Sequence, residues 1–128
     1  MMPNLPRDYV KTRERADRAI RNQGMRSVLR RNGQPDRPVS VVIQEYSAFE
    51  RMGKNIDPID RLCLLSALDP VTHEPLTIRP DRELDRLVTF IQPMSNPPVE
   101  DETLRFAAPP NLLNPGGVIV YFELRVRR

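Results

Sequence analysis

Proline is the residue that most limits how this chain can fold. Fourteen of its 128 residues are proline, and each one fixes φ at about −65° and lacks a backbone N–H donor. That number is too high for a helical bundle, so we expect irregular and extended structure to dominate. Several prolines fall in three loop-like stretches, at residues 70–80, 93–98 and 109–110. In such stretches proline costs little and stiffens the loop.

The segment at residues 118–128 predicts a half-buried strand. It follows the tight turn Leu113-Asn114-Pro115-Gly116-Gly117, and apolar and polar side chains then alternate with the period of two that such a strand requires. Only Ile119 breaks the pattern. We therefore expect this strand to belong to the core and to carry a charged outer face. The inward set is Val118, Val120, Phe122, Leu124 and Val126, and the outward set is Tyr121, Glu123, Arg125 and Arg127.

The remaining elements predict one domain that is mainly β. A helix is expected at residues 7–23, where it ends at Gly24 in a left-handed conformation. An extended loop is expected at 47–60 and an insertion at 91–111. Together these indicate a small β-barrel or sandwich, residues 25–128, that follows an N-terminal arm and helix, residues 1–24. The further expected strands are 25–31, 39–46, 61–68, 84–91 and 103–107.

Composition points to a soluble intracellular protein. Charged residues make up 29% of the chain, and no apolar run approaches the roughly 20 residues that cross a bilayer. The first residues lack the apolar region of a secretory signal. The single cysteine, Cys63, cannot form an internal disulfide.

Positive charge is concentrated in the first third of the chain. Residues 1–38 carry ten Lys or Arg against four Asp or Glu, whereas residues 39–128 carry ten against thirteen. Eighteen of the twenty basic residues are arginine, whose planar guanidinium favours forked contacts with carboxylates or phosphates. The pattern indicates a partner that is either an acidic protein surface or a nucleic acid.

The residues that could carry chemistry do not form a recognisable site. Cys63 lies in an apolar run, which predicts a buried hydrophobe, and His73 stands alone in a proline-rich loop, where we expect it to be exposed. Asp57, Asp60 and the acidic run 100–102 lack the fixed spacing of a cation loop, so we expect solvated surface there. No Gly-rich phosphate loop or hydrolase motif is present. We expect neither enzyme activity, a cofactor, a metal nor a small-molecule substrate.

Read in order, the segments resemble the small neck proteins that are encoded beside the head genes of tailed bacteriophages. The similarity covers roughly residues 16–128, and its most specific part is the Asn-Pro-Gly-Gly turn with the strand that follows. One departure is the stretch at 90–111, which is longer here than the corresponding segment usually is in relatives. The segments that carry the resemblance are 16–20, 24, 29–31, 45–48, 60–67, 85–88, 113–117 and 120–127.

The resemblance implies a head-closure, or stopper, protein of the head–tail connector in the virion neck. Such proteins are small β-barrels that form a homo-oligomeric ring, commonly a hexamer, between the portal-adaptor ring and the tail. Their loop between the second and third strands points into the channel and helps to retain packaged DNA. That loop corresponds to residues 47–60 here, and the residues near its tip are Arg51, Met52, Gly53, Lys54 and Asn55. Without the resemblance, a solvated connection is the simpler reading of this loop.

Two arginine clusters are the predicted ring contacts. The first, on the N-terminal helix, is expected to meet carboxylates on an adjacent ring, although a DNA-binding arm is the alternative. The second lies on the final strand, whose outer edge we expect to be exposed. Other readings are a tail-terminator or adaptor ring subunit and, from another class, a small basic nucleic-acid-binding regulator. The clusters are Arg13, Arg18 and Arg21, and Arg125, Arg127 and Arg128.

Overall fold

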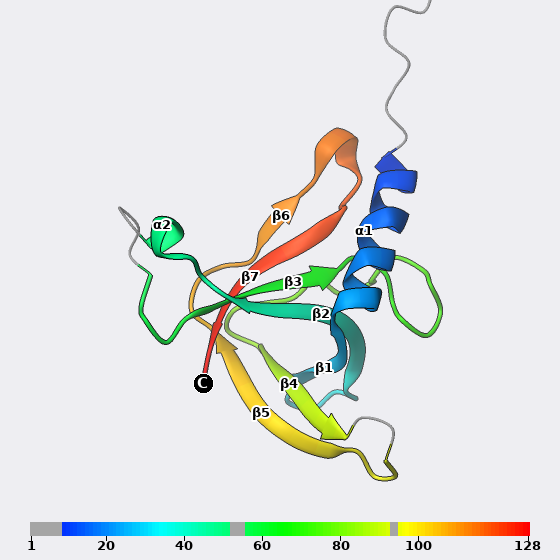
Figure 1. Cartoon of the computed structure of the whole chain (residues 1–128). Helices are drawn as coiled ribbons and strands as arrows, with labels where there is room; N and C mark the ends of the chain where they lie inside the picture. The colour runs from blue at the N-terminus through cyan, green and yellow to red at the C-terminus, as the bar shows by residue number, and fades with distance from the viewer. Residues whose placement is uncertain (1–8, 52–55, 93–94) are drawn as a thin grey trace, which may run out of the picture.

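A closed β-barrel forms the centre of the computed structural model (Figure 1). The structure describes residues 9–51, 56–92 and 95–128. Its elements are α1 (Tyr9–Gln23), β1 (Met25–Arg31), β2 (Arg37–Glu45), α2 (Ala48–Arg51), β3 (Arg61–Ser66), β4 (Asp85–Gln92), β5 (Val99–Phe106), β6 (Asn111–Leu113), the 3-10 turn η1 (Pro115–Gly117) and β7 (Tyr121–Arg127).

The strands pair in the order β3-β2-β1-β4-β5-β7-β6, and β3 also pairs with β7. This last pairing closes six strands into a barrel and leaves β6 as an extra strand beside β7. All the pairs are antiparallel. Closure is one way in which an all-β protein removes open sheet edges. The prediction of a mainly β, barrel-like fold with an N-terminal helix is confirmed.

The final strand supplies one wall of the core, as its alternation predicts. The side chains of Phe122, Leu124 and Val126 are buried, while Glu123 is exposed. The regular strand begins at Tyr121, later than predicted, because the preceding residues close the turn and the Val120 N–H donates to the Leu113 C=O at 2.8 Å. The core cluster comprises Leu29, Val39, Val41, Cys63, Leu65, Ala67, Leu87, Leu104, Phe106, Phe122, Leu124 and Val126.

The final strand is not an edge of the sheet, which corrects the sequence-based prediction. Along one side it pairs with β3, from Arg61↔Val126 to Ser66↔Tyr121. Along its other side it pairs with β5 and then with β6. Both edges are therefore occupied by the barrel itself. Alternation reports which face of a strand is buried, but it carries no information about which strands flank it.

Helix α1 packs against β1, β2, β3 and β7. It confirms the predicted helix over residues 9–23, while residues 7 and 8 lie outside the described part of the chain. Only two of its side chains are buried, Asp17 and Ile20, in keeping with its thin apolar stripe. None of the helices in the described ranges is long and apolar enough to cross a membrane.

Gly24 ends α1 for a reason that the sequence does not reveal. Its φ is not in the left-handed region, so the predicted left-handed stop is wrong. A Cβ atom at this position would lie only 1.9 Å from the Val41 carbonyl oxygen. The absent side chain instead lets the helix end approach the backbone of β2. The left-handed glycines among the described residues belong to two turns, with φ of 77° at Gly33, 59° at Gly116 and 79° at Gly117.

Two regions predicted as loops contain regular structure. The predicted insertion forms most of β5, which begins at Val99 and pairs with β4 to make a hairpin. The loop after β2 contains the short helix α2, which a capping box begins. Within it, the Glu50 N–H donates to Ser47 Oγ at 3.1 Å, and the Ser47 N–H donates to Glu50 Oε1 at 3.0 Å. The short strand β6 was also not predicted.

The β4–β5 hairpin extends beyond the closed part of the barrel. β4 pairs with β1 only through residues 85–88. β5 pairs with β7 only through Arg105 and Phe106. The edge of β5 that faces away from β4 therefore has no strand partner over residues 99–103 among the residues described.

Candidate functional site

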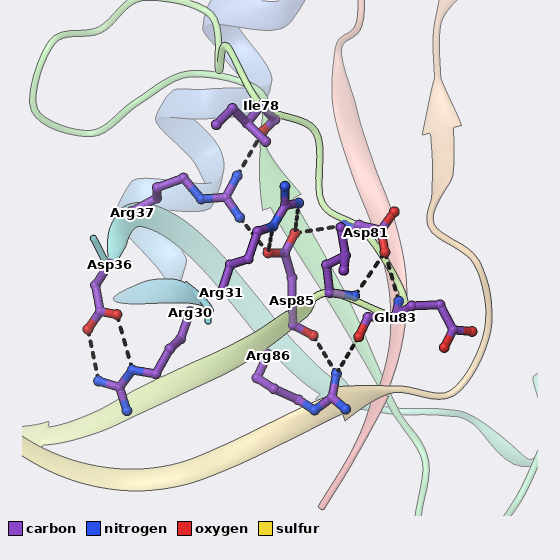
Figure 2. A network of polar contacts seen from close by, with 10 residues as sticks. Arg30, Arg31, Asp36, Arg37, Ile78, Asp81, Glu83, Asp85 and Arg86 are labelled. Carbon is purple, nitrogen blue, oxygen red and sulfur yellow. Dashed lines mark hydrogen bonds and ion pairs between the residues drawn. The ribbon is translucent and has the colours of Figure 1, made fainter. Parts of the chain in front are cut away.

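A buried carboxylate organises one end of the barrel. Asp85, the first residue of β4, is fully buried and accepts four hydrogen bonds. Arg31, at the end of β1, donates from Nε and Nη2 at 2.9 and 3.0 Å. Arg37, at the start of β2, donates from Nη2 at 2.6 Å, and the Asp81 N–H donates at 2.8 Å. Figure 2 shows the two guanidinium groups converging on this carboxylate from neighbouring strands. We call Arg31, Arg37, Asp81 and Asp85 the Asp85 cluster.

The electrostatics of the Asp85 cluster favour the charged carboxylate. Burial by itself raises the pKa of Asp85, but the hydrogen bonds from Arg31, the Asp81 amide and Arg37 outweigh it, so the pKa lies below its usual value. Both carboxylate oxygens are occupied by these donors. The cluster therefore fastens the 81–85 turn to the ends of β1 and β2, and it offers no free oxygen to a ligand.

A second ion-pair network links the β1–β2 turn to the β4–β5 hairpin. Arg30 donates to Asp36 from Nε and Nη2 at 3.1 and 2.8 Å, and its Nη2 also donates to Glu100 Oε1 at 2.7 Å. The Arg30 guanidinium lowers the pKa of the Asp36 carboxyl. These side chains are largely exposed, so the network contributes less to stability than a buried one of the same geometry.

The base of the loop between β2 and β3 is clamped by a buried aspartate. Asp60 is fully buried, and its Oδ1 lies 2.7 Å from Arg127 Nε on β7. Arg127 Nη2 and the Asp57 N–H both reach its other oxygen, at 3.0 and 3.1 Å. The prediction that Asp60 belongs to solvated surface is wrong. We call Asp60 with Arg127 the Asp60 clamp.

Glu102 on β5 joins three parts of the barrel. Arg61 at the start of β3 donates to it at 3.2 and 3.0 Å, and Arg128 also donates to it. Its partial burial alone raises the pKa of Glu102, but the two arginines outweigh this and hold the pKa below the usual value. The pair with Arg128 lies at the surface, whereas Arg61 is mostly covered.

The structure brings the first predicted arginine cluster together. Arg13, Arg18 and Arg21 of α1 line one polar groove, about 430 Å³ in volume, whose opposite wall is the 73–75 segment. At its floor the buried Asp17 binds Arg21, with Nε and Oδ2 2.8 Å apart, and accepts a hydrogen bond of 2.6 Å from Ser66 Oγ. Arg21 is therefore already engaged within the chain.

The Nε atom of Arg13 is buried at this groove and has no hydrogen-bond partner among the described residues. Neither Arg13 nor Arg18 has an ion-pair partner there. These two guanidinium groups remain available for an anionic group on a partner. The prediction that they contact another ring stays a prediction.

The second predicted arginine cluster is divided between internal contacts. Arg127 belongs to the Asp60 clamp, and Arg128 contacts Glu102. Arg125 forms a hydrogen bond with Tyr46. Burial raises the pKa of Tyr46, and this hydrogen bond partly opposes the rise. The described contacts thus explain all three residues as parts of the fold, and any role between subunits stays a prediction.

The predicted channel-loop residues cannot be placed as a group. Met52, Gly53, Lys54 and Asn55 lie outside the described residues, and Arg51 is the last residue of α2. What the structure does describe is the two stems. Glu45 of β2 pairs with Arg61 of β3, so the loop leaves and re-enters the barrel through neighbouring strands.

The structure confirms the predicted burial of Cys63 and the predicted exposure of His73. Cys63 is fully buried, and burial raises the pKa of its thiol to about 12, so it is not a reactive thiolate at neutral pH. His73 is exposed, as predicted, with a left-handed φ of 61°. Within the described ranges, no group of three or more His, Cys, Asp or Glu side chains is arranged to hold a metal ion.

An apolar groove of about 430 Å³ lies beside the Asp85 cluster. It runs between the β1–β2 turn and the 69–78 segment, and its apolar lining includes Pro35, Pro38, Pro75 and Leu76. Sequence reasoning did not identify this groove, because its walls come from segments about 40 residues apart. Only the proline content of both segments gave a local signal.

Sequence reasoning also missed the buried carboxylates. Asp85 and Arg31 are 54 residues apart, and Asp60 and Arg127 are 67 residues apart, so no local spacing indicates either pair.

Comparisons of the chain with protein-family models, with curated proteins and with solved structures found no match.

Proposed function

We propose that this chain is a structural subunit of the neck of a tailed bacteriophage. In this proposal, copies of the chain form a head-closure ring, commonly of six, between the portal-adaptor ring and the tail. The support from sequence is the resemblance of ordered segments across residues 16–128 to neck proteins. The support from structure is that the chain folds as a small closed barrel with an N-terminal helix, the architecture that the resemblance implies.

The Asp60 clamp is the observation that carries the proposal. It fixes one stem of the 47–60 loop to β7, and the α2 capping box orders the other stem. Figure 1 shows α2 on the side of the barrel away from α1. In a ring, symmetry repeats each loop around one axis. A loop held firmly at its base would then present the same segment of every copy to a central channel, where together they could retain packaged DNA.

Electron cryo-microscopy of virions from the phage that encodes the chain tests the proposal. We expect a ring of this chain between the portal-adaptor and the tail, with residues 47–60 directed toward the axis. Density at the top of the tail tube would identify a tail-terminator instead, and density directly beneath the portal would identify an adaptor. Absence of the chain from the particle would overturn the structural role.

A loop deletion tests the gating part of the proposal. Replacing Arg51 to Asn55 with a shorter glycine–serine linker leaves the Asp60 clamp intact, so we expect rings to assemble at normal occupancy. We also expect filled heads to lose DNA, measured as the fraction of nuclease-sensitive genome. The control is the same linker placed in the β1–β2 turn at residues 32–35, which contains none of the predicted ring-contact residues. Retention equal to the wild type in the loop variant would contradict a gating role.

A further inference from the structure

One side of α1 is mainly basic. Lys11, Arg15 and Arg18 follow one another at spacings of four and three, which places them on one side of a helix, and all three are exposed. Arg15 and Arg18 have no ion-pair partner among the described residues. Val10, in the first turn of the same helix, leaves 43% of its surface exposed. We call Arg15 and Arg18, with Val10 in the first turn, the basic face.

The first half of β5 is acidic and has an open edge. Its residues 100–102 are three successive carboxylates. Two of these bind arginines of the same chain, but Asp101 is exposed and has no ion-pair partner in the described ranges. Val99 beside it and Ile91 on β4 are 44% and 63% exposed. We call Ile91 with residues 99–103 the acidic ribbon.

The basic face and the acidic ribbon of one copy lie on different parts of the barrel. α1 packs against β1, β2, β3 and β7, whereas the ribbon belongs to the β4–β5 hairpin. Figure 1 shows α1 beside the upper part of the barrel and the hairpin at its lower end. Each surface combines unpaired charge with exposed apolar side chains, and the two charges are opposite. A contact that pairs the two surfaces with each other must therefore join two copies.

We propose that the acidic ribbon of one copy docks on the basic face of the next copy. Such a contact uses two different patches, so it is heterologous, and it closes into a ring when the rotation between copies divides a full turn. The inference rests on the proposed function in that it names the surfaces that would hold the ring together. Duplex DNA is the competing occupant of the basic face, but DNA would leave the acidic ribbon without a partner.

A charge exchange between the two surfaces tests the inference. One variant is Arg15→Glu with Arg18→Glu, and the other is Asp101→Arg. Sedimentation velocity of each variant alone should show self-association weakened about tenfold or more, since reversal replaces attraction with repulsion. An equal mixture of the two should recover association, because a contact between the two variants joins either two unchanged patches or two reversed patches. Rings in the mixture should contain even numbers of copies, alternating between the variants.

Matched controls separate the contact from a general effect of charge. Arg79→Glu with Arg82→Glu, and separately Glu83→Arg, change charge by the same amounts at exposed positions outside both surfaces, and they should associate as the wild type does. Circular dichroism should show that all the variants are folded. Recovery in the mixture would support the inference even if the chain were absent from virions, so its outcome is distinct from that of the proposed function.

Three results would overturn the inference. The first is a wild-type chain that stays monomeric at concentrations up to about 1 mM. The second is association that survives both charge reversals, or that the mixture does not restore. The third is loss of binding to a 20-base-pair duplex in the Arg15→Glu, Arg18→Glu variant with self-association unchanged, which would assign the basic face to nucleic acid.

Discussion

The Asp85 cluster and the basic face of α1 use arginine in opposite ways. In the cluster, Arg31 and Arg37 are mostly covered, and both donate to one fully buried carboxylate. On the basic face, Arg15 and Arg18 are exposed and have no ion-pair partner in the described part of the chain. The charges of the cluster are paired with each other and hold the barrel together, whereas the charges of the basic face can pair with other molecules.

This difference changes how the basic first third of the chain is read. Four of its arginines, Arg21, Arg30, Arg31 and Arg37, form ion pairs within the chain. A count of basic residues therefore overstates the charge available to a partner. A buried charge is costly unless it is paired, whereas an exposed charge is tolerated alone. Burial is thus what separates structural arginines from candidate contact residues.

The largest expected effect is the loss of the Asp85 carboxylate. Asp85→Asn keeps the shape of the side chain but leaves Arg31 and Arg37 without a counter-charge in a covered site. We expect the free energy of unfolding to fall by about 3 kcal/mol, measured by urea denaturation. Glu83→Gln, an exposed carboxylate in the preceding turn, is the control and should change stability by less than about 0.5 kcal/mol. A loss below about 1 kcal/mol for Asp85→Asn would contradict a structural role for the cluster.

The Asp60 clamp should show a smaller loss. Asp60→Asn removes a buried carboxylate that binds one arginine rather than two, so we expect a decrease of about 2 kcal/mol in the free energy of unfolding. Hydrogen exchange should also show that the amides of Asp57, Ile59 and Asp60 lose protection. A stability loss equal to that of Asp85→Asn would break the ranking by number of arginine partners.

Acid should lower the free energy of unfolding through the carboxylates that are paired within the chain. The pKa values of Asp36, Asp85 and Glu102 are all lowered in the folded chain. Between the folded and unfolded pKa values the unfolded state binds more protons, so this stabilisation is present above about pH 4 and is lost as the pH falls through the folded values. Urea midpoints between pH 7 and pH 3 should fall accordingly, and less steeply in Asp85→Asn. Equal slopes for the wild type and this variant would contradict the expectation.

The smallest effect on stability is expected on the basic face. Arg15→Glu with Arg18→Glu should change the free energy of unfolding by less than about 0.5 kcal/mol, because neither side chain has an ion-pair partner to lose among the described residues. Arg31→Glu, the same substitution within the Asp85 cluster, should destabilise strongly because it brings two carboxylates together. Comparable losses of stability in thermal denaturation for the two variants would remove the distinction between the two regions.

The sequence predicted the strands well where buried and exposed side chains follow the alternation of apolar and polar residues. The alternation at Phe122, Leu124 and Val126 identified β7 because half-buried strands repeat every two residues. Residues 99–103 were missed because three carboxylates obscure a strand that is ordered by its pairing with β4. The short helix α2 had a visible signal, Ser47 with Glu50 three residues later, which the prediction of an extended loop did not use.

The candidate site was less predictable because its parts meet only in the folded chain. Arg13, Arg18 and Arg21 could be grouped from helical spacing, and they do line one groove. The partners of Asp60 and Asp85 are too distant in sequence for any spacing rule. Whether a given arginine is paired or available therefore depends on tertiary structure, and the run of basic residues could not show it.

The proposed ring depends on charges that the barrel leaves unpaired. Native mass spectrometry of the wild-type chain across a salt series measures whether such a ring forms. We expect a closed ring of one copy number at low salt that dissociates to monomer as salt rises, because the proposed contact is electrostatic and exposed. A monomer at every salt concentration, or a ladder of copy numbers without a closed species, would contradict it.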